Sequence, residues 1–575
     1  MVWTARAGAR TDGGPLLERV MAARGLAGLD QDTFLNPRLT QLHNPSQLPG
    51  LERAAERILR AAHAGEPIAI YGDYDADGCT ATAILVRTLR ALFPTLDVRT
   101  YVPHRLDEGY GLNSEAIAKL TSDGARVIVS VDCGITAIGP ARAARESGVD
   151  LIITDHHNPL GHEPDGGPWP EAYAIVHPRV PHDTLRYPFH DLCGAGVAYK
   201  LAWRLCTMHT GTDKLPAALR NLLIDLLALT SLGVIADVVP LKDENRVIAR
   251  FGLPRIASSP FVGLSALVRA SNLDGENIDT EAVGFRLAPR LNASGRLGHA
   301  REAVELLTTD DPARAMRIAQ ELTRQNNERR ETERRILEQA IERAEAEGMT
   351  SPDRRAIVLA DERWHAGVVG IVCSRLVERY HRPTILLSIS DGEAHGSGRS
   401  VEGFNLHGAI KEASGPLTTF GGHDMAAGLK LPAERMPEFV ELFIAEANRR
   451  LAPEELVGKS HFDSVAQLGE LSPAAVGDML ALGPFGRENP MVRLVIESAE
   501  VASDAKLIGS QANHTKVRLR DATLPGGMDF LCWQSPDLAP VLRRGVRVDA
   551  LVVPKISTFR GYATVEPQLV DVRLK

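Results

Sequence analysis

Residues 67–78 read PIAIYGDYDADG, and this stretch decides the fold class. It opens with a short β-prone apolar run and ends with three aspartates at alternate positions, Asp73, Asp75 and Asp77. A helix-like stretch follows, from about Thr80 to Leu92. A short buried strand, a polar turn and a helix are typical of one unit of a parallel α/β sheet.

The same pattern recurs twice further along the chain. The apolar run 127–131 ends at Asp132, and the run 151–154 ends at Asp155, His156 and His157. Short continuous apolar strands that alternate with helices predict a parallel, doubly wound α/β sheet. Because the carboxyl ends of parallel strands lie on one edge, we expect these acids and histidines to converge there.

Length and composition bound the rest of the chain. At 575 residues it has room for three or four domains, and 44% hydrophobic with 24% charged residues excludes a disordered or fibrous protein. The net charge of −8 excludes a uniformly basic surface but allows a local basic groove. The six cysteines form no C-x-x-C pair, so we expect a reducing cytoplasm rather than disulfides or zinc.

No targeting or membrane segment is expected. The first residues contain no apolar core of a secretory signal. The most apolar stretch, Leu222 to Val239, carries Asp225 and Asp237, and carboxylates are costly in hydrocarbon. We interpret this stretch as buried core and expect a cytoplasmic protein that does not bind membranes.

The chain divides by composition into five parts. Residues 1–50 are expected to be an irregular N-terminal segment, and 51–310 the first α/β domain. Residues 311–350 predict a connector helix whose charges form a solvated face. Residues 351–450 predict a second α/β domain, with glycine-rich turns at 396–400 and 421–428. Five or so short strands in 456–575 predict a small β-barrel, such as an OB-fold.

Three carboxylates at alternate positions repel one another and need a cation. A calcium loop of the EF-hand type is excluded, because its twelfth position is Ile84 instead of glutamate. Adjacent histidines after Asp155 favour Mn²⁺ or a related divalent ion. Asp237 lies in an apolar stretch, so its carboxylate is either a metal ligand or a buried, hydrogen-bonded group.

These motifs, in this order, resemble the DHH phosphoesterase superfamily. The resemblance rests on Asp75-Ala-Asp77-Gly, Asp132, Asp155-His-His157 and Asp237. Residues 364–370 (WHAGVVG), 396–400 (GSGRS) and 421–428 (GGHDMAAG) resemble the associated DHHA1 domain. Residues 484–490 (PFGRENP), the β-rich tail and Phe34-Leu-Asn-Pro37 resemble the RecJ branch of this superfamily, so that the likeness covers nearly the whole chain.

The resemblance implies a two-metal hydrolase that uses Mn²⁺ or Mg²⁺. It implies 5′→3′ hydrolysis of single-stranded DNA to 5′-mononucleotides, in DNA repair and recombination. His157 would contact the phosphate or assist proton transfer, Asp155 would orient an adjacent group, and Asp73 is the least certain ligand. The metal ligands that it implies are Asp75, Asp77, Asp132, His156 and Asp237.

Substrate contacts should be cationic. Residues 284–301 contain four arginines and no acid, and Asn292-Ala-Ser-Gly295 is predicted to interrupt them as a phosphate-cradling turn. An ordinary exposed basic loop is the alternative. Residues 396–400 are predicted to form an anion nest of backbone N–H groups. The resemblance implies a 5′-phosphate grip by Arg290, Ser397 and Arg399, with Arg105 and Arg296 as further candidates, and His423 either near the nucleotide or structural.

Two other functions stay open at this level. One is a phosphodiesterase for cyclic dinucleotides or short oligonucleotides, or a pyrophosphatase, although such an enzyme has no need of the barrel-like tail. The other is a binding scaffold that has lost catalysis, although the carboxylates are intact. Expected partners are single-stranded DNA with a 5′ end, a single-strand-binding protein and a helicase, and the chain is expected to be a monomer.

Overall fold

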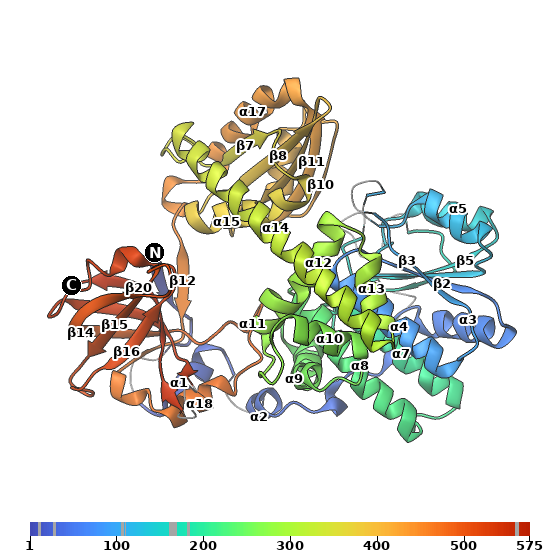
Figure 1. The fold of residues 1–575 in the computed structure, drawn as a ribbon, viewed down its shortest axis with the longest axis horizontal. Helices are drawn as coiled ribbons and strands as arrows, with labels where there is room; N and C mark the ends of the chain where they lie inside the picture. The colour runs from blue at the N-terminus through green and yellow to red at the C-terminus, as the bar shows by residue number, and fades with distance from the viewer. Residues whose placement is uncertain are drawn as a thin grey trace. The chain divides into compact units, whose positions relative to one another are not determined.

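The computed structural model divides the chain into two compact units, residues Leu39–Leu456 and residues Met1–Arg38 together with Val457–Lys575 (Figure 1). The residues that it describes are 1–9, 13–26, 30–104, 108–109, 111–159, 169–180, 185–557 and 563–575.

A five-stranded parallel sheet forms the centre of the first α/β domain. Its strands are β2 (Ile68–Gly72), β3 (Val98–Tyr101), β4 (Val127–Val131), β5 (Asp150–Thr154) and β6 (Ala174–Val176). They lie in the order β3-β2-β4-β5-β6, and every pair is parallel, which confirms the predicted sheet. The order reverses between β2 and β4, the topological switch point where such folds place ligands.

Alternating residues of the strands fill two hydrophobic cores, one on each face of the sheet. Ile68 and Ile70 belong to the core that α4 (Ala76–Leu92) and α7 (Gly194–Thr210) cover. Ala69 and Tyr71 belong to the opposite core, which α5 (Ser114–Ser122) and α6 (Ile138–Glu146) cover. This two-residue period explains why the strands read as continuous apolar runs.

A helical layer completes this domain. It consists of α3 (Leu51–Ala64), α8 (Ala217–Ala236), α9 (Asp243–Ala257), α10 (Val262–Ala270), α12 (Ala288–Leu297) and α13 (Arg301–Thr308). By length and composition α8 is apolar enough to cross a membrane, and a bent pair formed by α9 and α10 passes the same test. Residues Leu226–Val234 of α8 are buried against α4, α7 and α9, as expected for a core helix.

The phosphate-cradling turn predicted within residues 284–301 is wrong, and so is the alternative of an exposed basic loop. The segment is helical, with a π-helical turn at Val283–Leu287 followed directly by α12. Asn292 and Gly295 lie inside α12, so they form no phosphate-cradling turn. This segment has an apolar helical face that includes the buried Leu287 and Leu291. Burial of that face favours a helix over the turn that the asparagine and glycine indicated.

One long helix, α14 (Pro312–Ala346, 35 residues), runs through this unit and confirms the predicted connector (Figure 1). The Asp311 side chain caps it by accepting hydrogen bonds from the N–H groups of Ala313 and Arg314. Ile318 and Leu322 pack into the core of the first α/β domain, whereas Ile336 packs into a core of the second. The helix therefore belongs to both cores.

The second domain has a mixed five-stranded sheet in the order β10-β11-β9-β8-β7. β7 (Ile357–Asp361) and β8 (Thr384–Ser390) are parallel, and the other pairs are antiparallel. The predicted turn at 396–400 is wrong, because residues up to 399 belong to a strand paired on both sides. The other elements are β9 (Glu393–Arg399), β10 (Thr419–Gly422), β11 (Ala426–Pro432), α15 (Ala366–Tyr380), α16 (Leu406–Glu412) and α17 (Met436–Arg450).

The C-terminal region forms a closed five-stranded barrel, as expected. Its strands are β14 (Leu494–Ile508), β15 (His514–Arg520), β16 (Met528–Cys532), β17 (Arg547–Val553) and β20 (Gln568–Leu574). Pairing of β14 with β17 closes the ring. The short strand β13 (Ser464–Ala466) and the helix α18 (Pro473–Leu480) flank it.

Residues 1–38 complete this second unit, so the irregular segment predicted there is wrong in part. β1 (Val2–Ala5) pairs in parallel with β12 (Lys459–Phe462), and α1 (Leu16–Ala23) buries Leu16 and Val20 in the barrel's core. The buried carboxylate of Asp463 accepts hydrogen bonds of 2.9 and 3.0 Å from Arg24, just after α1. These partners lie more than 400 residues away, so no local pattern indicated them.

Candidate metal centre

The sheet edge that carries the acids is built from three strand ends. Asp73 and Asp75 follow β2, Asp132 follows β4, and Asp155 follows β5. Asp132 has a backbone φ of 63°, a left-handed conformation that is uncommon for a residue with a side chain. The β2 and β4 ends flank the switch point of the sheet, which brings these groups together as the sequence pattern predicts.

Asp77 is held by the N-terminus of α7. Its two carboxylate oxygens accept hydrogen bonds from the backbone N–H groups of Gly194 (2.6 Å) and Ala195 (2.9 Å). The positive end of the helix macrodipole favours a carboxylate at this place. Burial and the nearby Asp75 nevertheless raise the pKa of Asp77 to about 6. A bound cation is what such a site needs to keep the carboxylate ionised.

The loop between β2 and α4 is fixed by two side chains. Asp75 caps α4 by accepting hydrogen bonds from the N–H groups of Asp77 (2.9 Å) and Gly78 (3.0 Å). Asn292 on α12 accepts a 2.7 Å hydrogen bond from the N–H of Ala76. Asn292 thus supports the acidic loop, a role that the sequence reading missed because its partner lies 216 residues away.

His156 lies at the centre of the cluster. Its Nε2 atom is 3.1 Å from Asp132 Oδ1, 3.6 Å from Asp237 Oδ2 and 3.9 Å from Asp77 Oδ2. Asp237 reaches this point from the C-terminal end of α8. Burial lowers the pKa of His156 to about 3, so the imidazole is neutral, the form that binds metals.

The donor set fits divalent cations. Within the described residues the buried Nε2 atom of His156 has no hydrogen-bond partner, although three carboxylates surround it. Three overlapping groups hold ligand atoms within 4.8 Å of one another: Asp132, His156 and His157; Asp77, His156 and Asp237; and Asp73, Asp75 and Asp132. Mixed carboxylate and imidazole ligands favour Mn²⁺ or a related divalent ion over Ca²⁺.

Asp155 points its carboxylate at its own turn and at His157. One oxygen accepts hydrogen bonds from the N–H groups of His156 and His157 and lies 2.8 Å from Nδ1 of His157, while the other accepts one from Ile135. Burial alone would raise the pKa of Asp155, but the hydrogen bond and charge of His157 hold it well below its usual range. Burial opposes protonation of His157, yet the hydrogen bond and charge of Asp155 raise its pKa to about 9. Asp155 therefore orients His157.

The candidate phosphate-binding residues lie on two elements. Ser397 and Arg399 are neighbours on β9, where the Arg399 guanidinium donates to Ser397 Oγ (3.3 Å). On α12, Arg290 donates to Thr323 Oγ1, and Arg296 donates to the backbone oxygen of Gly367 (2.9 Å). Burial and the charge of His157 lower the pKa of His423. Arg105 lies outside the described residues.

The predicted anion nest at residues 396–400 is wrong in its chemistry. β9 pairs with β8 on one side and β11 on the other, so ladder hydrogen bonds occupy its backbone. An anion at this strand would be bound by the side chains of Ser397 and Arg399, which are half-buried. The alternation of glycine and polar residues, GSGRS, comes from close packing in a strand and not from a turn.

A parallel sheet with carboxylates and histidines at its switch point, joined by a helix to a second α/β domain, defines a metal-dependent phosphoesterase of the DHH class. Profiles of three families match the chain in order: the DHH family, N-terminal domain, at residues 67–230, the DHHA1 domain at 353–449, and the RecJ OB domain at 462–571. The chain belongs to the RecJ family of single-stranded-DNA-specific exonucleases.

Known relatives support this membership over most of the chain. The single-stranded-DNA-specific exonuclease RecJ of Bacillus subtilis is 38% identical over 558 residues, which are 96% of this chain and 67% of the relative. That of Salmonella typhimurium is 33% identical over 579 residues, 97% of this chain and 96% of the relative. The crystal structure of RecJ from Thermus thermophilus with Mn²⁺ has a TM-score of 0.80 and 32% identity, covering 100% of this chain and 79% of that one.

Proposed function

We propose that this protein hydrolyses single-stranded DNA from its 5′ end and releases 5′-mononucleotides, in DNA repair and recombination. The observation that carries the proposal is the convergence of three carboxylates on the Nε2 atom of His156, at the switch point of a sheet. Family membership supports the substrate, because the relatives are named single-stranded-DNA-specific exonucleases.

The proposed metal ligands are those brought together at the sheet edge. Divalent ions bound there, Mn²⁺ or Mg²⁺, would supply an activated water and stabilise charge on the phosphate. Asp73 is proposed as a further ligand, because it shares a group with Asp75 and Asp132. The remaining proposed ligands are Asp75, Asp77, Asp132, His156 and Asp237.

His157 is proposed to contact the scissile phosphate or carry its proton. Its ring is partly exposed, and Asp155 orients the ring through the 2.8 Å contact at Nδ1. The protonated form that Asp155 favours suits an anion or a leaving oxygen. Asp155 acts through His157 and is a positioning residue.

The 5′-phosphate is proposed to be held by Arg290, Ser397 and Arg399, with Arg105, Arg296 and His423 as further contacts. A guanidinium and a hydroxyl on β9 offer a bidentate grip for a phosphomonoester. Arg296 already bonds the backbone of Gly367, so its contribution is to link α12 with α15 as much as to bind substrate.

The barrel is proposed to bind the strand by charge and base stacking. Trp533 is half-exposed and meets the His514 ring edge-on at 4.7 Å between centroids. Several basic side chains of the barrel are paired with acids, among them Lys516 and Arg520.

We also propose that the protein is a cytoplasmic monomer that works with a single-strand-binding protein and a helicase. The proposed division of the chain is into residues 1–50, 51–310, 311–350, 351–450 and 456–575.

The test uses one strand labelled at its 5′ end in one reaction and at its 3′ end in another, with Mn²⁺ or Mg²⁺. We expect labelled mononucleotide at once from the 5′ label and late from the 3′ label, and little hydrolysis of blunt duplex. Asp77→Asn and His157→Ala should each lower the rate by at least about a hundredfold. Preference for a dinucleotide over a long strand would instead favour the phosphodiesterase, and indifference to both substitutions a scaffold.

A further inference from the structure

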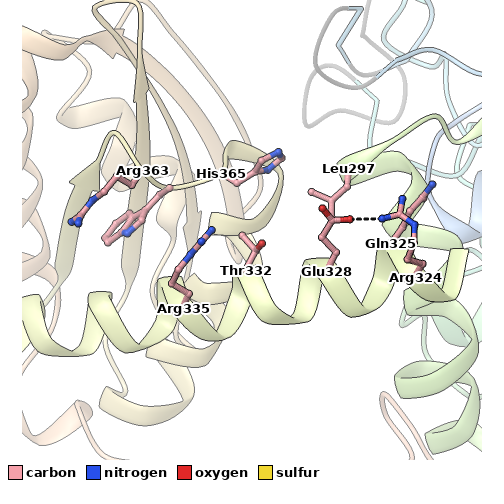
Figure 2. A pocket seen from close by; sticks show the side chains of 9 residues that line it. Leu297, Arg324, Gln325, Glu328, Thr332, Arg335, Arg363 and His365 are labelled. Carbon is pink, nitrogen blue, oxygen red and sulfur yellow. Dashed lines mark hydrogen bonds and ion pairs between the residues drawn. The ribbon is translucent and has the colours of Figure 1, made fainter. Parts of the chain in front are cut away.

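The WHAGVVG motif, Trp364–Gly370, has no residue in the metal-binding groups of the described chain. Its first two residues line a cavity of about 450 Å³ beside α14, within the unit Leu39–Leu456. Figure 2 shows Thr332 and Arg335 rising from α14 toward the segment that carries Arg363 and His365, with Gln325 further along α14 and Leu297 at the end of α12. Ligand pockets commonly have volumes of about 300–1,000 Å³, so the cavity has room for a mononucleotide.

Two side chains of α14 in this cavity lack partners. Within the described residues, the Arg335 guanidinium makes no ion pair or hydrogen bond, and the Thr332 hydroxyl makes no hydrogen bond. They lie three residues apart, so they share one face of the helix. Arg324, Arg329 and Arg334 are paired within α14, the last with Glu338 at 3.2 Å.

His365 adds a third donor. Its Nδ1 atom accepts a 3.1 Å hydrogen bond from the N–H of Gly367. In a neutral imidazole the other nitrogen then carries the proton, so Nε2 is a hydrogen-bond donor. Burial lowers the pKa of His365, which favours the neutral imidazole at neutral pH.

The other charged side chains that line the cavity already have ion-pair partners. Arg324 is paired with Glu321 (2.6 Å) and Glu328 (3.0 Å), and Arg363 is paired with Asp361 (2.8 Å). Glu328, the acid that lines the cavity, is thus occupied. What remains available is one guanidinium, one hydroxyl and one imidazole N–H, which together match a phosphate.

Gln325 indicates more than a bare phosphate. Its side chain is 7% exposed, and its Nε2 group donates to Glu302 and Glu321. Its Oε1 atom is buried with no hydrogen-bond partner among the described residues. A buried amide oxygen costs free energy unless it receives a donor. A sugar hydroxyl or a base amino group of a ligand would supply that donor.

We propose that this cavity is a second nucleotide site, separate from the metal centre, in which Arg335, Thr332 and His365 bind the phosphate and Gln325 accepts a hydrogen bond from the sugar or base. The nucleotide comes either from a free mononucleotide or from the phosphate backbone of a bound strand. The site is defined by its lining residues, so it does not rest on the proposed nuclease activity.

The test measures binding by calorimetry to the full chain in EDTA, so that no hydrolysis occurs. The probes are dTMP, inorganic phosphate and a twelve-nucleotide thymidine strand, and the variants are Arg335→Gln, Gln325→Leu and the control Arg334→Gln. Arg334 is the adjacent residue of the same helix and does not line the cavity. Circular dichroism and thermal melts check that each variant is folded.

We expect Arg335→Gln to weaken binding by about tenfold and Arg334→Gln by less than about twofold. If Arg335→Gln weakens binding of dTMP, the natural ligand is a free nucleotide. If it weakens binding of the strand alone, and the slope of log affinity against log salt concentration falls by about one, the ligand is a phosphate of a bound strand. Gln325→Leu should weaken the binding of dTMP but not that of inorganic phosphate. Equal behaviour of Arg335→Gln and Arg334→Gln with all three probes would overturn the proposal. Hydrolysis of a labelled strand by the unsubstituted chain is measured separately, so failure of either proposal is recognised on its own.

Discussion

Gly233, one turn before Asp237 on α8, shows how closely the metal centre is packed. A Cβ atom at this position would lie 2.4 Å from Asp77 Oδ1 and 2.6 Å from the Cβ of Ala195. Gly194 is in the same situation, since its Cβ would lie 2.5 Å from that of Asp132. Gly194 on α7 and Gly233 on α8 therefore leave the space that the carboxylates of Asp132 and Asp77 occupy.

Gly233→Ala should displace the Asp77 carboxylate from the cluster. Because supporting residues of metal sites typically affect affinity by about 10–100-fold, we expect Mn²⁺ to bind that much more weakly. Calorimetric titration with Mn²⁺ measures it. The matched control is Gly139→Ala on α6, where a Cβ meets nothing within 4 Å and alanine should stabilise by about 0.5–1 kcal/mol. Unchanged Mn²⁺ affinity in Gly233→Ala would contradict the packing argument.

At the scale of elements, α14 links two hydrophobic cores through different turns of one helix. Leu322 packs in the core of the first α/β domain, and Ile336 packs with α15 and β7 in the second. Both side chains are fully buried. Each domain core therefore includes a different part of the same helix.

Truncating either side chain should loosen one domain and not the other. Ile336→Ala is expected to lower stability by about 2–5 kcal/mol and to speed hydrogen exchange mainly in α15 and β7. Leu322→Ala should lower stability by a similar amount and speed hydrogen exchange mainly in α10, α12 and α13. Hydrogen exchange with mass spectrometry locates the change. The same exchange pattern in the two variants would show that α14 does not divide in this way.

The last turns of α17 carry a pH-dependent contribution to stability. Hydrogen bonds from Arg449 and Arg450 lower the pKa of Glu446 from 4.5 to about 2. A carboxylate whose pKa is depressed in the folded state stabilises that state above its unfolded pKa and loses this contribution as the pH falls. The loss should therefore occur between about pH 4.5 and pH 2.

Glu446→Gln should flatten the pH dependence of the melting temperature in that window, with little change at pH 7 beyond the lost ion pairs. Melting curves at pH 2.5–7 measure it, and added salt should shrink the difference. Glu441→Gln, an exposed change on the same helix, is the control. An identical pH profile for Glu446→Gln and the unsubstituted chain would refute the assignment.

At the scale of the whole molecule, the two ends of the chain form one unit. β1 and β12 pair over four residues, and Arg24 binds both oxygens of Asp463. Residues 1–38 therefore depend on residues 457–575 for their fold. The unit Leu39–Leu456 contains both α/β domains and all of the candidate metal ligands.

Removing the barrel should therefore unfold the N-terminal segment. In a chain of residues 1–456, we expect limited proteolysis to remove residues 1–38 rapidly, because Leu16, Val20 and Met21 lose their core. A chain of residues 39–456 should stay protected and bind Mn²⁺. Mass spectrometry of the fragments measures this. Protection of residues 1–38 without the barrel would show that they fold without it.

The sequence alone determined the parallel sheet, the connector helix and the convergence of the acids. These features follow from local periodicity and from the rule that parallel strands end on one edge. The turns predicted from sequence at Asn292–Gly295 and at residues 396–400 are wrong, because packing places these residues in α12 and β9 despite their glycine and asparagine turn signals. Only the tertiary structure decided that Asn292 supports the acidic loop, that α7 presents its N-terminus to Asp77, and that residues 1–38 belong with the barrel. Each of these depends on partners more than a hundred residues away, which hydrogen bonding and close packing select and no local pattern records.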